Sequence, residues 1–233
     1  KIPRRNAMIF HIVLNILGVA LGIYVSFQIG IPLFGLVFLL ITGILWFYST
    51  TYKRQFLVGN VVVALLIALV PLMVVLFEIP ELNKTYKEAL LKNNIDFMYI
   101  FYWVLAFSFF AFLTNLMREI VKDAQDFEGD SAYGRNSLPV VLGMKATKGV
   151  IEALLIITIG ALVFAYTLYL QDKITLIYFS LFLFLPFLFL IVKTFYANSK
   201  SDYRLIGNVL KITMLFGVLY AFVARYIIET QIL

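Results

Sequence analysis

The sequence predicts an all-α protein, a polytopic bundle of transmembrane helices. Of its 233 residues, 63% are hydrophobic and 17% aromatic, whereas only 14% are charged. This composition excludes a soluble globular domain and a disordered chain. An apolar run needs about 17–25 residues to cross a bilayer as a helix. Seven such runs are visible, at residues 7–27, 31–49, 57–77, 97–119, 148–170, 174–194 and 207–230.

The connections between these runs predict how neighbouring helices pair. Residues 28–32 (QIGIP) and 171–173 (QDK) are so short that the helices they join are expected to be antiparallel neighbours. The longer segment 77–96 has mixed charge and is expected to hold a short helix. No internal repeat or low-complexity tract interrupts the sequence, so residues 1–233 are expected to form a single transmembrane domain.

The distribution of lysine and arginine sorts the loops onto two sides of the membrane. Most of these residues fall on one side, which the positive-inside rule makes cytoplasmic. The same bias accounts for the formal charge of +6, so the basic excess does not indicate nucleic-acid binding. Two polar segments, 48–60 and 118–143, lie on this cytoplasmic side and predict a shared site there. The sequence has no cysteine and one histidine, which excludes disulfides, thiolate metal sites and multi-histidine metal centres.

The segment 118–143, REIVKDAQDFEGDSAYGRNSLPVVLG, is the strongest functional signal. Acidic residues close to a bilayer are costly and indicate function. Asp123, Asp126 and Asp130 stand at i, i+3 and i+7, so a helix that continues through the segment places all three on one face. Carboxylate oxygens suit a hard cation such as Mg2+ or Mn2+, which keeps part of its shell for water and phosphate. The three aspartates are therefore the expected metal ligands and catalytic residues of a diphosphate site at the mouth of an apolar cavity.

Two bases accompany the aspartates. Arg118 and Lys122 are expected to bind the remaining phosphate oxygens of the substrate. The alternative is a solvated cytoplasmic loop whose charges pair with one another and have a structural role only.

The segment resembles the second aspartate-rich motif of the UbiA superfamily of intramembrane prenyltransferases. The pattern in that family is close to R-E-x-x-K-D-x-x-D-x-x-G-D, followed by a glycine and a T-L-P-x-x-x-G tail. The matching residues here are Arg118, Glu119, Lys122, Asp123, Asp126, Gly129, Asp130, Gly134, Leu138, Pro139 and Gly143. Ser137 stands where the family usually has threonine.

A second segment, YSTTYKRQFLVGN at 48–60, resembles a loop whose bases contact the diphosphate in that family. The resemblance implies that Tyr48, Lys53, Arg54 and Asn60 bind the substrate diphosphate together with Arg118 and Lys122. For Lys53 and Arg54 alone, the alternative is an ordinary positive-inside anchor.

The resemblance also implies a longer protein. The family has nine transmembrane helices and a first aspartate motif after its second helix, and neither that motif nor two of the helices are found in these 233 residues. The opening KIPRRNAMIF is similar to the basic stretch that follows the first motif in relatives. We therefore expect two helices and half of the metal site to precede Lys1.

The resemblance implies an enzyme, a Mg2+-dependent prenyltransferase that releases diphosphate. Its substrates would be a polyprenyl diphosphate, geranylgeranyl diphosphate by expectation, and a lipophilic acceptor. The motif is most similar to the branch of the family that forms archaeal-type ether lipids, in which the acceptor is geranylgeranylglyceryl phosphate. An aromatic acid of quinone biosynthesis stays open as the acceptor, and the sequence does not define the oligomeric state.

Outside enzymes, the alternative is a small transporter with a cytoplasmic cation site. A transporter predicts ionisable residues along a path near the middle of the membrane. The apolar runs are nearly free of such residues, and the acids collect at one end. The sequence therefore favours an active site that opens toward the cytoplasm.

Overall fold

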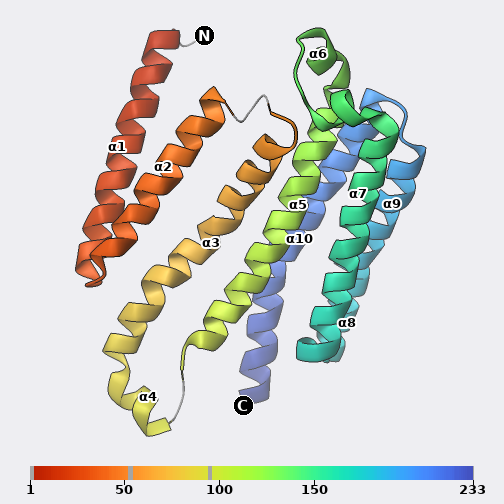
Figure 1. Cartoon of the computed structure of the whole chain (residues 1–233). Coiled ribbons are helices and arrows are strands. Elements are labelled where there is room, and N and C mark those ends of the chain that lie inside the picture. Colours follow the sequence, from red (N-terminus) through yellow and green to blue (C-terminus); the bar gives the residue numbers. More distant parts are fainter. Residues whose placement is uncertain (1–2, 52–54, 94–95, 233) are drawn as a thin grey trace. The chain divides into compact units, whose positions relative to one another are not determined.

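The computed structural model describes residues 3–51, 55–93 and 96–232, and all regular structure in these residues is helical (Figure 1). Seven helices are long and apolar enough to cross a membrane, which confirms the predicted class of fold. The first elements are α1 (Arg4–Gln28), the 3₁₀ turn η1 (Pro32–Phe34), α2 (Gly35–Thr50), α3 (Val58–Thr85), α4 (Lys87–Asn93) and α5 (Met98–Gln125). They are followed by α6 (Phe127–Ala132), α7 (Leu138–Ala165), the π-helical turn η3 (Tyr166–Leu170), α8 (Lys173–Phe179), the π-helical turn η4 (Ser180–Phe184), α9 (Leu185–Tyr196) and α10 (Lys200–Ile232).

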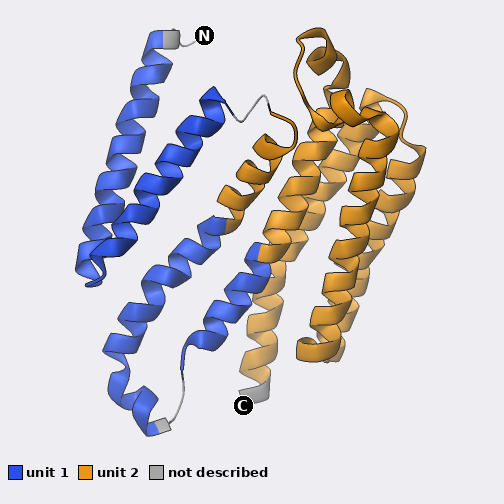
Figure 2. Cartoon of the chain, viewed as in Figure 1, with its two compact units in different colours: residues 1–53, 69–108 blue, residues 54–68, 109–233 orange. Residues whose placement is uncertain are grey.

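The chain divides into two compact units, coloured blue and orange in Figure 2. Unit 1 comprises residues 1–53 and 69–108, and unit 2 comprises residues 54–68 and 109–233. Helices α3 and α5 each contribute to both units. The aspartates of the segment 118–143 therefore belong to unit 2, as do α6 to α10.

Several helices extend beyond the apolar runs that predict them. α5 continues from residue 119 to Gln125, α7 begins at Leu138 and α10 begins at Lys200. Hydropathy marks only the part of a helix that is apolar enough to contact lipid. The backbone hydrogen bonds of a helix are satisfied within the helix, so it can continue past the apolar part through polar residues. The predicted short helix in the segment 77–96 is confirmed as α4.

The core of unit 2 lies between α5, α7, α9 and α10. α7 packs on α9, and α9 packs on α10. α5 meets α10 where Val121 lies against Gly207, because a β-carbon at Gly207 would stand 3.7 Å from Cγ1 of Val121. The largest fully buried side chains of this unit include Met117, Ile120, Leu138, Ile151, Leu155, Leu190, Tyr203, Ile206 and Leu210.

Two glycines shape the connection from α6 into α7. Gly134 has a φ of 62° and Gly143 a φ of 80°, in the left-handed region that other residues adopt only with strain. Gly143 interrupts the helical dihedral angles inside α7, so the first turn of this helix departs from the axis of the rest. The hydroxyl of Thr147 donates to the carbonyl of Gly143 at 2.9 Å and satisfies one backbone acceptor beside this break.

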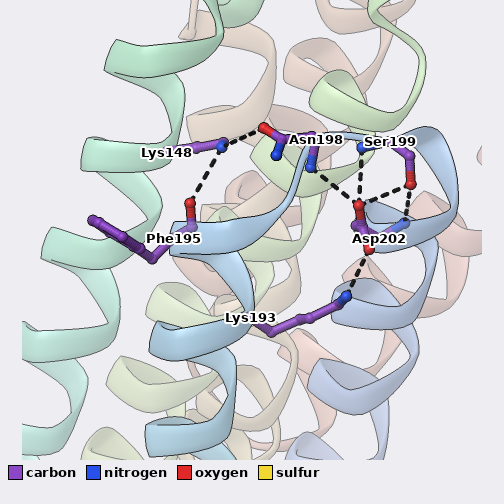
Figure 3. Close-up of polar contacts among 6 residues, drawn as sticks. All are labelled: Lys148, Lys193, Phe195, Asn198, Ser199 and Asp202. Atoms are coloured by element: carbon purple, nitrogen blue, oxygen red, sulfur yellow. Dashed lines mark hydrogen bonds and ion pairs between the residues drawn. The ribbon is translucent and has the colours of Figure 1, made fainter.

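The corner between α9 and α10 is held by a dense set of hydrogen bonds (Figure 3). The carboxylate of Asp202 accepts from the backbone N–H groups of Asn198 and Ser199 at 3.0 and 2.9 Å, and from Nζ of Lys193 at 2.6 Å. In return the backbone N–H of Asp202 donates to Oγ of Ser199 at 3.2 Å, which completes a reciprocal capping box at the start of α10. Lys148 ties α7 to the same corner through Oδ1 of Asn198.

Replacing Ser199 with alanine is expected to lower the melting temperature by about 2–4 °C. The loss of an N-cap side chain costs about 1 kcal/mol, which corresponds to this shift in a chain of this size. Thermal unfolding in detergent measures the effect. Ser201→Ala is the matched control, because Ser201 lies in the first turn of the same helix and takes no part in the capping box. Equal melting temperatures for both variants would contradict the assigned role of the cap.

Candidate functional site

Charged side chains gather at one end of unit 2. The C-terminus of α5, the short helix α6 and the N-termini of α7 and α10 meet there (Figure 1). The N-terminal turns of α3 belong to the same unit and contribute Asn60. Of the residues predicted for the site, this end holds Arg118, Lys122, Asp123, Asp126, Asp130 and Asn60.

Asp123 is the residue with the most defined surroundings. Its half-buried carboxylate accepts a hydrogen bond of 2.7 Å from Nδ2 of Asn60, 63 residues earlier in the chain. The same carboxylate is repelled by the charges of Asp130 and Glu119 and attracted by that of Lys122. The amide therefore orients a carboxylate that other anionic groups surround.

The other two aspartates each pair with a base. Asp130 lies in α6, is only 7% exposed, and its Oδ1 stands 3.3 Å from Nη1 of Arg135. Asp126 is exposed, and its Oδ1 stands 3.8 Å from Nζ of Lys200, the first residue of α10. The α9–α10 corner thus contacts the aspartate segment, a contact that sequence reasoning missed.

The three aspartates would share one face if a single helix continued through the segment, and the structure does not meet that condition. α5 ends at Gln125, and Asp126, with φ −98° and ψ 11°, separates it from α6. Asp123 therefore lies in the last turn of α5, Asp126 at the junction and Asp130 in α6. The spacing i, i+3, i+7 cannot reveal this break, because residues 123–128 contain neither glycine nor proline and are each compatible with a helix.

Glu119 forms ion pairs with Arg118 and Lys122, the two bases that the sequence analysis assigned to the diphosphate. Arg118 Nη1 lies 3.1 Å from its Oε1, and Lys122 Nζ lies 3.3 Å from its Oε2. Glu119 was matched to the motif but given no role from sequence. Its position one residue from Arg118 and three residues from Lys122 was the available signal, because side chains three apart in a helix are neighbours.

The chemistry of the acidic side chains fits a hard divalent cation. Among the described residues, no three acidic or histidine side chains are already arranged to hold a metal. Mg2+ is commonly bound through one or two carboxylates, with water and substrate phosphates completing its shell. Asp123 and Asp130 repel one another, and a cation between them would relieve that repulsion. The donor set thus fits Mg2+ in company with a phosphate-bearing substrate.

The structure does not place the remaining predicted residues relative to this cluster. Tyr48 lies near the end of α2, in unit 1. Lys53 and Arg54 lie outside the described residues. Their assignment to the diphosphate stays a prediction.

Unit 2 is thus an apolar helical bundle with carboxylates and bases gathered at one end. The chain belongs to the UbiA prenyltransferase family, whose sequence model matches residues 1–223. It is therefore a multi-pass membrane protein and a prenyltransferase, an enzyme that releases diphosphate.

The similar proteins include several archaeal synthases of one kind. The digeranylgeranylglyceryl phosphate synthase of Methanosphaera stadtmanae is 26% identical over 227 residues, covering 96% of this chain and 71% of that protein. The enzyme of the same name from Korarchaeum cryptofilum is 27% identical over 224 residues, covering 94% and 69%. That of Methanothermobacter thermautotrophicus is 31% identical over 153 residues, covering 66% and 45%. No solved structure matches this chain.

Proposed function

We propose that this enzyme transfers a geranylgeranyl group from geranylgeranyl diphosphate to the hydroxyl of geranylgeranylglyceryl phosphate. The bond between C1 of the prenyl chain and the diphosphate oxygen breaks, and its electron pair leaves with the diphosphate. The acceptor oxygen then bonds to C1, and the hydroxyl proton leaves with the released diphosphate. The product is a diether of glyceryl phosphate that carries two geranylgeranyl chains.

The observation that carries the diphosphate part of the proposal is the hydrogen bond from Asn60 to Asp123 beside Asp130. It joins two segments, 48–60 and 118–143, that the sequence analysis assigned to one shared site. The names of the similar archaeal synthases support the choice of acceptor.

Each residue of the cluster has a proposed role. Asp123, Asp126 and Asp130 would hold Mg2+, which when bound supplies positive charge to the leaving diphosphate. Asn60 orients the carboxylate of Asp123. Arg118 and Lys122 would contact the outer phosphate oxygens while Glu119 keeps both bases in place.

The site is proposed to open toward the cytoplasm. The support is the concentration of lysine and arginine in the loops at this end of the helices, which the positive-inside rule assigns to the cytoplasmic side. An acceptor or prenyl diphosphate made in the cytoplasmic leaflet would then reach the charged end without crossing the membrane.

Replacing Asn60 with alanine is expected to lower kcat/KM for prenyl diphosphate by about 10- to 100-fold. Residues that orient a metal ligand through a hydrogen bond typically contribute an effect of this size. Initial rates at varied prenyl diphosphate and Mg2+ concentrations measure it, and the Mg2+ requirement should rise in parallel. Asn83→Ala is the control, because Asn83 is an exposed amide of the same helix α3 but belongs to unit 1, outside the cluster. An unchanged Mg2+ requirement in Asn60→Ala would contradict the orienting role.

The acceptor is tested with the full-length protein in membranes. Radiolabelled geranylgeranyl diphosphate is offered with geranylgeranylglyceryl phosphate, 4-hydroxybenzoate or dihydroxynaphthoate in parallel reactions. The proposal predicts a diether product from the first acceptor alone, and no product from Asp126→Ala. Transfer to an aromatic acid and none to the glyceryl phosphate would replace the ether-lipid function with one in quinone synthesis.

A further inference from the structure

α10 carries a polar stripe that the function described so far does not use. The stripe consists of Lys200, Arg204, Asn208 and Lys211, and all four side chains are exposed. With 3.6 residues per turn, these positions fall within about 80° of the helix circumference. The buried residues Tyr203, Ile206 and Leu210 occupy the opposite side of the helix.

The stripe is rich in positive charge and poor in partners. Lys200 pairs with Asp126 at 3.8 Å, and Nζ of Lys211 lies 3.5 Å from Oδ1 of Asn208. Among the residues that the structure describes, Arg204 has neither a hydrogen-bonding nor an ion-pair partner. Like charges one turn apart on a helix repel one another, so an anion bound along the stripe would be stabilised by all three bases.

The stripe extends further along α10, toward the middle of the membrane, than a basic anchor at the membrane surface would need. The next charged residue on this face is Arg225, 14 residues after Lys211 and hence about 21 Å away along the helix. The hydrocarbon core of a bilayer is about 30 Å thick. Lysine and arginine can extend their charged ends toward the interface, but the short amide of Asn208 cannot. The half of the face formed by residues 200–211 is therefore better suited to contact a polar ligand or water than to contact lipid tails.

The same face turns apolar beyond Lys211. Leu215, Val218 and Phe222 follow it and are 57%, 64% and 70% exposed. A polar half of about 16 Å is thus continuous with an apolar half of similar length. The pattern is complementary to an amphiphile with an anionic head and a hydrocarbon tail.

We propose that this face of α10 binds the acceptor, with Arg204 and Lys211 holding its phosphate and the apolar half contacting its prenyl chain. The inference rests on the proposed function. Lys200 connects the two proposed substrate sites, because it is the first residue of the stripe and its Nζ lies 3.8 Å from Oδ1 of Asp126 in the diphosphate cluster. An acceptor held there presents its head group to the end of the bundle at which the prenyl diphosphate reacts.

The test compares Arg204→Gln and Lys211→Gln with the unchanged full-length protein in an uncharged detergent. KM is measured separately for geranylgeranylglyceryl phosphate and for geranylgeranyl diphosphate. Each variant is expected to raise KM for the phosphate acceptor by about 10- to 100-fold, the value of one charge-assisted hydrogen bond, and to leave KM for the diphosphate unchanged. Arg204→Lys should raise KM for the phosphate acceptor much less than Arg204→Gln does, since lysine retains the positive charge.

Arg225→Gln is the matched control. It removes a base from the same face of the same helix, at the opposite end, where Arg225 pairs with Glu229 at 2.8 Å. A second acceptor, the phosphate-free geranylgeranylglycerol, separates binding of the phosphate from support of the helix. The unchanged protein should prefer the phosphate acceptor, and the two stripe variants should lose that preference.

Three results would overturn the inference. An equal loss with both acceptors would assign the stripe to structural support, and a rise in KM for the diphosphate alone would assign it to the donor. Unchanged kinetics in both variants would assign it to ordinary membrane lipid. Failure of the proposed function gives a different result, because the unchanged protein would then show no transfer to geranylgeranylglyceryl phosphate.

Discussion

Replacing Asp123 with asparagine is expected to lower kcat for prenyl transfer by about 100- to 1,000-fold. The substitution keeps the size of the side chain but removes the charge that would bind Mg2+ beside Asp130. Loss of one group that stabilises transition-state charge typically has an effect of this size. Single-turnover rates at saturating prenyl diphosphate and Mg2+ measure it.

The control for this variant is Glu128→Gln. Glu128 is an exposed acid of α6, two residues from Asp130, and lies outside the proposed cluster. The control should retain nearly full activity. If Asp123→Asn and Glu128→Gln had equal rates, the acidic segment would act through its total charge and not through a metal site.

Removal of divalent cations with EDTA is expected to reduce transfer to the background rate. Without a cation, the negative charges of Asp123, Asp130 and the substrate diphosphate repel one another, and the leaving group gains no compensating charge. Excess Mg2+ should restore the rate fully. Ca2+ should restore it poorly, because it takes more ligands at longer distances.

The reference measurement for cation removal is the melting temperature of the protein without substrate. It should stay nearly constant when EDTA is added, since the helices pack through apolar side chains and not through the carboxylates of the cluster. Transfer at the full rate in EDTA would exclude the metal–diphosphate chemistry.

The transmembrane helices were predictable because their signal is the composition of long segments. A run of about 20 apolar residues has few stable alternatives to a membrane helix, since its backbone hydrogen bonds must be satisfied internally. The polar ends of the same helices carry no such signal. This explains why the N-terminal turns of α7 and α10 were not predicted from hydropathy.

The candidate site was predictable in its residues but not in its contacts. The identities of Asp123 and Asn60 followed from two motifs, and the structure adds that their side chains touch. The break at Asp126 was missed because local spacing cannot report how a segment packs against α7 and α10.

The stripe on α10 was missed for a different reason. Lys211 lies within the run 207–230, where a single base hardly changes the mean hydropathy. Its relation to Lys200 and Arg204 appears only when helical register is applied across the predicted boundary at residue 207. The interpretation that the runs are nearly free of ionisable residues overlooked this position.

The central claim is that Asp123 and its neighbours bind the prenyl diphosphate through a divalent cation. The most direct measurement replaces Mg2+ with paramagnetic Mn2+ and follows free Mn2+ by electron paramagnetic resonance while an unreactive prenyl diphosphate analogue is added. We predict that the analogue drives Mn2+ binding in the full-length protein and that Asp123→Asn loses this binding. Equally strong Mn2+ binding in Asp123→Asn, or Mn2+ binding that does not depend on the analogue, would contradict the claim.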